Sequence, residues 1–336
     1  MEQRLFAHGF AVSRLVESIH TRYAFPPIIA SLLITGLLPY STAFGLWFFM
    51  GDPTLISYGF LLAFLWLALC PYLIWKMENI ADDFFKEFYQ KAIDKERMRN
   101  FADSLDRTTH SIPGYLLGVP FVIGADYLSF LVFPQVSIVA RAFLISYLSL
   151  LFLLAGLGFW GVVALIRMTL SVKNITVKTN PFNPDRFGGL EFAGSLCIKV
   201  TLFFSSGSLV FPLVFEAIQV IRYSTALVLA NALTAAYIVA ILVAFFVPTL
   251  ALRDWFLRIK RSHLSPVSEQ IGKMLERCLS SGTDEEKKRF YDLISFYNEI
   301  DKMKVWPFDL PVIVKLLGSI SLPILVALIE NFRPVP

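Results

Sequence analysis

The sequence AFLISYLSLLFLLAGLGFWGVVALI, residues 142–166, contains no charged side chain and lies between Arg141 and Arg167. At about 1.5 Å per residue, a helix of this length crosses the roughly 30 Å hydrocarbon core of a bilayer. The whole chain is similarly apolar: 56% of its 336 residues are hydrophobic, 17% are charged, and its mean hydropathy is +0.63. Ordinary soluble domains carry about 25% charged residues. We therefore predict an all-α, polytopic membrane protein, and we exclude nucleic-acid binding and a plain cytosolic enzyme.

Seven apolar runs have about the length that a helix needs to cross a bilayer. The last run begins with Asp309, Pro311 and Lys315, so it either spans the membrane or re-enters it. The predicted spans are residues 25–50, 55–75, 114–134, 138–168, 194–221, 225–252 and 307–330.

The distribution of lysine and arginine predicts the orientation of these spans. Of the 30 basic residues, 25 fall in alternate connections, which are residues 1–24, 76–113, 167–193 and 253–305. Cytosolic loops are the ones that carry an excess of basic residues. We therefore expect a plasma-membrane protein with a cytosolic N-terminus and an external C-terminus.

The predicted cytosolic segments are large enough to have structure of their own. Residues 1–24 form an amphipathic helix that either lies on the membrane or packs on the protein itself. Residues 253–305 form a helical hairpin that turns at Ser280-Ser281-Gly282. The predicted order is a helix at 1–24, spans at 25–76, a cytosolic helix at 77–113, spans at 114–168, a loop at 169–193, spans at 194–252, the hairpin at 253–305, and a last span with the C-terminus at 306–336.

Two parts of the chain have prolines and basic residues at corresponding positions. The second and sixth runs both end in P-x-L-x-x-[KR], beginning at Pro71 and Pro248, and the run before each has a central proline, Pro39 or Pro212. Each pair then leads into a charged helix and another span. This pattern favours a parallel internal repeat of span, span, cytosolic helix and span.

The fifth run has a polar face. Thr201, Ser205, Ser208, Glu216 and Gln219 recur at helical spacing, with Pro212 on the same side. Hydroxyls and freed carbonyls at membrane depth replace hydration water in conducting proteins. The alternative is close helix packing, with each hydroxyl bonded to its own backbone.

Other spans contribute polar residues to the same prediction. Asn231 and Thr234 of the sixth run would face the fifth run, and Ser31, Thr35 and Thr42 of the first run would be the repeat equivalents of its polar face. Asn231, Thr234 and the five polar residues of the fifth run are therefore the seven candidates for lining a route through the membrane, and the three residues of the first run are their repeat equivalents.

Four charges inside or beside the spans need an explanation. Lys199 and Lys315 lie near cytosolic span ends, where they either snorkel to the interface or form a vestibule for anions. Asp126 and Arg141 flank a predicted turn at similar depth. Between them a structural ion pair is favoured over an ion or proton site.

The loop before the fifth run is rich in turn residues: Asn183-Pro184-Asp185-Arg186-Phe187-Gly188-Gly189-Leu190. Asn183, Asp185, Arg186, Gly188 and Gly189 would form either a structural turn or an anion-binding gate at a helix start. The segment resembles the H-P-D-x-x-G-G-L loop of uncharacterised prokaryotic multi-span membrane proteins, with asparagine in place of histidine. That resemblance implies a similar membrane architecture and carries over no activity.

These features favour a channel or carrier for ions or small solutes, with the fifth span lining the route and a homo-oligomer as the assembly. One alternative is a membrane sensor or scaffold that signals through its cytosolic helices. The other is a lipid-headgroup enzyme that uses the loop. The chain has no metal-ligand spacing, no cofactor motif and no nucleophile–base motif, so we expect no enzyme, no cofactor and no metal.

Overall fold

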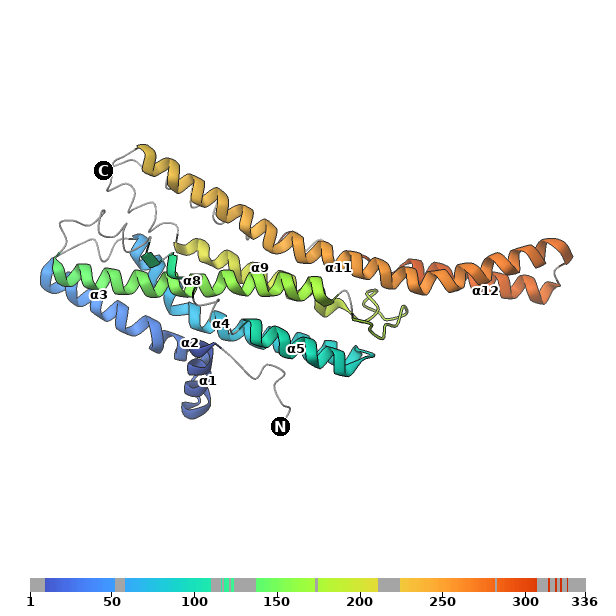
Figure 1. The fold of residues 1–336 in the computed structure, drawn as a ribbon, viewed down its shortest axis with the longest axis horizontal. Helices are drawn as coiled ribbons and strands as arrows, with labels where there is room; N and C mark the ends of the chain where they lie inside the picture. Colours follow the sequence, from blue (N-terminus) through green and yellow to red (C-terminus); the bar gives the residue numbers. More distant parts are fainter. Residues whose placement is uncertain are drawn as a thin grey trace.

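The computed structural model describes residues 10–51, 58–109, 137–172, 175–210, 224–281 and 283–306, with isolated positions within 116–123 and 314–325. In this part of the chain the regular structure is helical apart from a single bridge between Ala92 and Val177. The elements are α1 (Ala11–Tyr23), α2 (Pro27–Ser31), the π-helical turn η1 (Leu32–Gly36), α3 (Leu37–Met50), α4 (Tyr58–Lys91), α5 (Lys95–Thr109), α8 (Ile138–Val172), α9 (Glu191–Ser205), the 3-10 turn η3 (Ser206–Val210), α11 (Ser224–Ser281) and α12 (Asp284–Asp301) (Figure 1).

Five helical stretches are long and apolar enough to cross a membrane: Pro27–Phe49, Tyr58–Lys91, Ile138–Val172, Glu191–Val210 and Thr234–Leu279. They coincide with the first, second, fourth, fifth and sixth predicted runs. The third and seventh runs, 114–134 and 307–330, lie outside the described residues apart from isolated positions. The described residues thus form an all-helical structure with five helices that could span a membrane, and the count of seven, the internal repeat and the orientation stay predictions.

Three candidate spans are longer than a bilayer core requires: α4 has 34 residues, α8 has 35 and α11 has 58. At the usual helical rise α11 is about 87 Å long, so it is far longer than the roughly 30 Å hydrocarbon core. α12 folds back along its far end, and this α11–α12 hairpin projects beyond the other helices (Figure 1). The hairpin turns where the sequence predicts it. Thr283 caps α12 in a capping box, and the hydrogen bond from its backbone N–H lowers the pKa of Glu286.

The segment predicted as one cytosolic helix over 77–113 has a different form. α4 runs without a break from the membrane to Lys91, and the chain then turns before α5 begins at Lys95. The Asp94 carboxylate accepts the backbone N–H of Arg97 at 2.9 Å, which starts the new helix. A segment much later in the chain stabilises this turn, because the Lys178 N–H donates to Lys91 O at 2.8 Å.

The first span is fastened to α4 at Pro71. Proline has no N–H, so it leaves the Leu67 carbonyl of α4 without its helical donor. The Thr35 hydroxyl donates to that carbonyl at 2.8 Å. One turn away, the Ser31 hydroxyl donates to Ala68 O at 2.6 Å and accepts the Tyr72 N–H at 3.0 Å. Both hydroxyls are buried, so they complete the backbone hydrogen bonds of the proline-containing helix.

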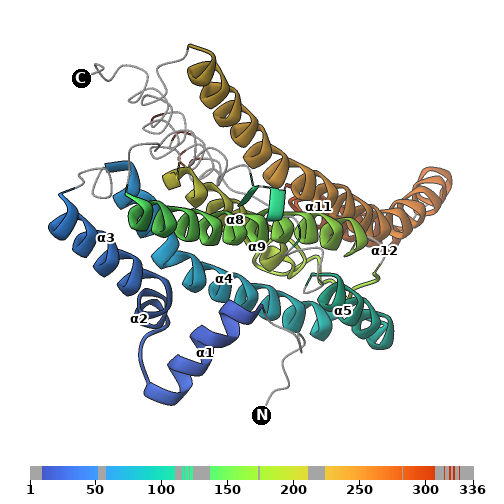
Figure 2. The ribbon, with the colours of Figure 1, turned by 60° about the vertical axis from the view of Figure 1, so that its left-hand side comes forward.

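α1 turns away from the line of α2 and α3 and packs against α4 (Figure 2). Val16 on its inner face is fully buried, whereas Leu15 and Tyr23 are exposed. The first turn of α1 is held by Glu78 of α4, which accepts the backbone N–H of Phe10 at 2.7 Å and the hydroxyl of Ser13. Of the two alternatives for this amphipathic helix, packing on the protein therefore describes its inner face.

Candidate functional site: an apolar cavity between the spans

A cavity of about 120 Å³ lies between α4, α8 and α9, near the end of these helices at which the polar helix α5 packs. It is only partly enclosed, and nearly all of its wall is apolar. Its lining residues are Ile74, Met77, Glu78, Ala81 and Phe85 of α4, Leu157, Gly158, Gly161, Val162, Ala164, Leu165 and Met168 of α8, Leu196, Val200 and Phe203 of α9, with Leu105 of α5 and Phe10.

The hollow follows from small residues on α8. Gly158 and Gly161 present no side chain to the space between the helices, and a Cβ atom built on Gly161 would meet nothing within 4 Å. On Gly158 the nearest atom would be Cε1 of Phe203, at 4.0 Å. Protein interiors are normally packed as densely as organic crystals. An unfilled space of this size between helices is therefore a feature of the sequence that needs a reason.

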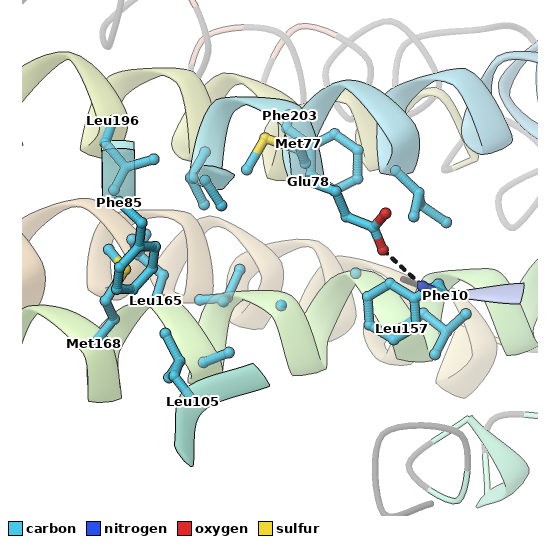
Figure 3. A pocket seen from close by; sticks show the side chains of 17 residues that line it. Phe10, Met77, Glu78, Phe85, Leu105, Leu157, Leu165, Met168, Leu196 and Phe203 are labelled. Carbon is cyan, nitrogen blue, oxygen red and sulfur yellow. Dashed lines mark hydrogen bonds between the residues drawn. The ribbon is translucent and has the colours of Figure 1, made fainter. Parts of the chain in front are cut away.

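Glu78 is the one charged residue among the described residues of the wall. Figure 3 shows its carboxylate at the same end of the cavity as Phe10 and Leu157, whereas Phe85, Leu165 and Met168 lie at the other end. The carboxylate is held by Phe10 N–H and the Ser13 hydroxyl, which belong to the first turn of α1. A negative charge at a helix N-terminus is stabilised by the helix dipole. The cavity thus has an apolar end and a carboxylate end, and the carboxylate end is attached to α1.

The size and chemistry of the wall limit what the cavity can hold. A cavity of about 150 Å³ lined by Leu, Ile and Phe stays dry and takes up benzene. A wall that offers one carboxylate, already hydrogen-bonded, gives water few of the two to four polar partners it needs. The space therefore suits a small hydrocarbon group, such as an aromatic ring or a few carbons of an acyl chain.

The polar face predicted on the fifth span lies on a different side of α9 from the cavity. Thr201, Ser205 and Ser208 are buried, with 1%, 4% and 0% of their surfaces exposed, and none of them lines a described cavity. Thr201 donates to Cys197 O at 2.7 Å and Ser205 to Leu202 O at 2.9 Å, within their own helix. At Thr201 and Ser205 the geometry is that of the packing alternative, whereas the Ser208 hydroxyl has no hydrogen-bond partner in the described structure.

The remaining route candidates are distributed as follows. Thr234 is buried, and Thr42 is half-buried on α3. Ser31 and Thr35 are committed to the backbone of α4, a structural use that the sequence analysis does not predict. Glu216, Gln219 and the side chain of Asn231 lie outside the described residues.

The charged candidates are not brought together by the described structure. Lys199 is exposed on α9. Arg141 is half-buried near the start of α8. Lys315 and Asp126 lie outside the described residues, so the vestibule and the Asp126–Arg141 pair stay predictions.

The loop 180–190 has the geometry of a structural turn. One carboxylate oxygen of Asp185 accepts the N–H groups of Phe187 and Gly189, at 2.9 and 3.0 Å, so these donors are not available to an anion. Arg186, Gly188 and Gly189 all have positive φ, and the Lys91 ammonium donates to Gly189 O. The backbone of Lys304 donates to Arg186 O at 2.8 Å, which ties the loop to the end of the α11–α12 hairpin.

A polar recess lies beside this loop, between α4 and α9. It is lined by Glu87, Lys91, Asn183, Asp185, Gly189, Glu191, Phe192 and Ser195. Its three carboxylates do not form a metal site: within the described ranges, no three His, Cys, Asp or Glu side chains are placed to share an ion. The recess gives the lipid-headgroup enzyme no phosphate-binding donors beyond Lys91 and side-chain amide and hydroxyl groups.

The cavity and Glu78 are not predicted from the sequence. Residues 77–113 are predicted as a separate cytosolic helix, yet Ile74, Glu78, Ala81 and Phe85 share one face of a continuous α4. The signal that could have found it is the pair Gly158 and Gly161 opposite an apolar helix face. Comparison of the chain with protein-family models, with curated proteins and with solved structures finds no match.

Proposed function

We propose that this protein is a membrane receptor that binds a small hydrophobic group from the bilayer in the cavity between α4, α8 and α9. The response would be carried by the helices outside the membrane and not by a path across it. The single observation that supports the proposal is the apolar cavity itself, which borders α1 through Phe10 and Glu78.

The position of α1 gives binding a means of acting on the rest of the protein. Phe10 is both a wall residue and the donor to Glu78. A bound group that moves Phe10 would therefore also disturb the hydrogen bond that attaches α1 to α4. A ligand can shift a conformation only when it interacts differently with the two states. Contact with Phe10 supplies such a difference, because Phe10 lines the cavity only while α1 is attached.

A benzene-sized photoreactive probe, a trifluoromethyl-phenyldiazirine, tests this function on the full-length protein in nanodiscs. Light-driven insertion into Leu165, Met168 and Val200 is expected, and it is read by peptide mass spectrometry. These three side chains are at most 5% exposed, so the surrounding lipid phase does not explain their labelling. Leu150 and Phe246 are exposed and serve as internal standards for labelling from the lipid.

Gly161→Leu fills the cavity, and Gly45→Leu is the matched control. A Cβ on either glycine meets nothing within 4 Å, and both glycines lie in membrane helices, but only Gly161 lines the cavity. We expect Gly161→Leu to reduce labelling of the three wall residues by about tenfold or more, since a leucine side chain occupies most of a benzene-sized space. Equal labelling in both variants would refute the receptor function.

One observation favours a second function, transport. Ser208 lies in the 3-10 turn that continues α9, it is fully buried, and its hydroxyl is left without a hydrogen-bond partner in the described structure. A polar group in that state either is costly or faces a partner such as an ion or water. Flux of several ions through liposomes, with and without a pH gradient, tests transport; a thiol reagent applied to Ser208→Cys must block any flux observed.

A further inference from the structure

Besides the cavity and the recess, a groove lies where the extended segment 175–179 meets α11, and the proposed function does not use it. It has a volume of about 480 Å³. Thr176, Lys178 and Thr179 contribute from the segment, and Arg258, Ser262 and His263 from α11, over a floor that includes the buried Trp255. Two backbone hydrogen bonds hold this segment against the turn after α4. The Ile93 N–H donates to Thr176 O, and the Lys178 N–H donates to Lys91 O.

The charge of this groove is opposite to that of the recess on the other side of the loop. Lys178 and Arg258 give it two positive charges, His263 adds an imidazole, and none of its described lining residues is Asp or Glu. The recess beside α9 has Glu87, Asp185 and Glu191 against a single lysine. The groove and the recess, which neighbouring stretches of the 175–190 connection form, therefore favour ligands of opposite charge.

The donors of the groove match a phosphate group. Arginine offers a planar pair of N–H donors that binds two phosphate oxygens, and lysine adds a compact positive charge. The hydroxyls of Thr176 and Thr179 lie in the same wall, whereas the Ser262 hydroxyl donates to Ile259 O at 2.7 Å within its own helix. The Thr179 hydroxyl and His263 Nε2 are 2.7 Å apart, so a hydrogen bond already joins the two sides of the groove.

The groove lies just beyond the end of a span. The apolar part of α11 gives way to charged residues at Arg253, and Trp255 and Arg258 follow within two turns. Basic residues at this level of a membrane helix lie among lipid headgroups, whereas Trp255 is buried in the protein. We infer that this groove binds a phosphate-bearing anion through Lys178, Arg258 and His263, supplied either by a lipid headgroup or by a soluble phosphate.

The double variant Lys178→Gln/Arg258→Gln tests the site on the full-length protein in nanodiscs. The matched control is Arg261→Gln/Lys273→Gln, which removes two positive charges from the same helix outside the groove. One arm measures retention of phosphatidic acid, present as a minority in phosphatidylcholine nanodiscs, by native mass spectrometry. The other arm measures binding of radiolabelled inorganic phosphate in nanodiscs of phosphatidylcholine alone.

We expect the groove variant to lose about tenfold in binding in at least one arm, which corresponds to the loss of charge-assisted hydrogen bonds at a partly exposed site. Arg258→Lys keeps the charge but not the paired donors, so it should lose less than the double variant. Loss confined to phosphatidic acid identifies a lipid headgroup, and loss that includes inorganic phosphate identifies a soluble anion. An equal loss in the groove and control variants, or no loss in either, would overturn the inference.

Discussion

The two faces of α9 show how poorly polarity alone marks a binding site inside a membrane protein. Thr201 and Ser205 carry the hydroxyls, yet they are buried and bonded to carbonyls of their own helix. Leu196, Val200 and Phe203 carry no polar atom in their side chains, yet they border the hollow. A hydroxyl can be satisfied by the preceding turn and then packs like a small apolar group. Empty space depends on the volume of the residues opposite, and here the glycines of α8 supply it.

The first span shows a third use of the same residue types. Ser31 and Thr35 reach across to α4, because Pro71 leaves a carbonyl there without a donor. α11 also has an internal proline, Pro248, but the hydroxyls of α9 do not reach across to it; instead Tyr237 of α11 donates to Phe204 O of α9. The two halves of the predicted repeat therefore share their prolines and differ in how their helices are joined.

The largest expected effect comes from adding volume to each face of α9. Ser205→Leu places three carbons where the side chain is 4% exposed and packed, so we expect a loss of about 1–3 kcal/mol in the free energy of unfolding. Val200→Leu extends into the cavity and should change stability by less than about 0.5 kcal/mol. Thermal unfolding of both variants in one detergent measures the difference. Equal destabilisation would show that the cavity face is as tightly packed as the other.

Next in size is the effect of the hydroxyl that does reach across. Thr35→Ala leaves the Leu67 carbonyl without a donor and should cost about 1–2 kcal/mol of unfolding free energy. In a Pro71→Ala background residue 71 regains its N–H, so the same substitution should then cost little. This double-mutant cycle in thermal or denaturant unfolding measures the coupling. Additive effects would contradict the assignment of Thr35 to the carbonyl that Pro71 frees.

A smaller effect is expected at the carboxylate end of the cavity. Glu78→Gln removes the charge that faces the first turn of α1, and we expect α1 to detach more readily by about 1 kcal/mol. Hydrogen exchange of the amides of α1 reports this detachment, and Asp83→Asn, exposed on the same helix, is the control. Unchanged exchange in Glu78→Gln would separate the cavity from α1.

The smallest effects belong to the hydroxyl face itself. Thr201→Val keeps the shape and removes a hydroxyl bonded within its own helix, so stability should change by less than about 0.5 kcal/mol. Ser208→Ala removes a buried hydroxyl left without a partner in the described structure, and it should be neutral or slightly stabilising. Both are measured by thermal unfolding. A marked loss of stability in either variant would show that these hydroxyls have partners the packing account lacks.

The sequence predicts the helical membrane architecture because that signal is carried by whole segments. Five apolar runs coincide with long apolar helices, and the turn near Ser281 is placed by its own turn and capping residues. It does not predict that α4 continues to Lys91, since the charges after Lys76 lie on a helix that packs α1 on one face and the 180–190 loop at its end. How far such a helix continues depends on the tertiary contacts that stabilise it, and the composition of a single segment does not show those contacts.

The candidate site is less predictable for a related reason. Periodicity places Thr201, Ser205 and Ser208 on one face, and the structure agrees that they share burial. Whether that face borders water is decided by residues from other helices, which a single sequence does not align in space. The two grooves beside the 175–190 connection depend in the same way on Lys91, Arg258 and His263, which come from distant parts of the chain.

Cysteine accessibility on the two faces of α9 tests the central claim most directly. Val200→Cys and Thr201→Cys are compared in a background where Cys70, Cys197 and Cys278 are replaced by serine or alanine. Each variant is treated in nanodiscs with a membrane-permeant phenyldiazirine, whose light-generated carbene needs no thiolate, and with a charged methanethiosulfonate. We predict that position 200 reacts with the apolar reagent alone, that Gly161→Leu suppresses this reaction, and that position 201 reacts with neither reagent. Reaction of the charged reagent at position 201, with position 200 protected from both, would contradict the account.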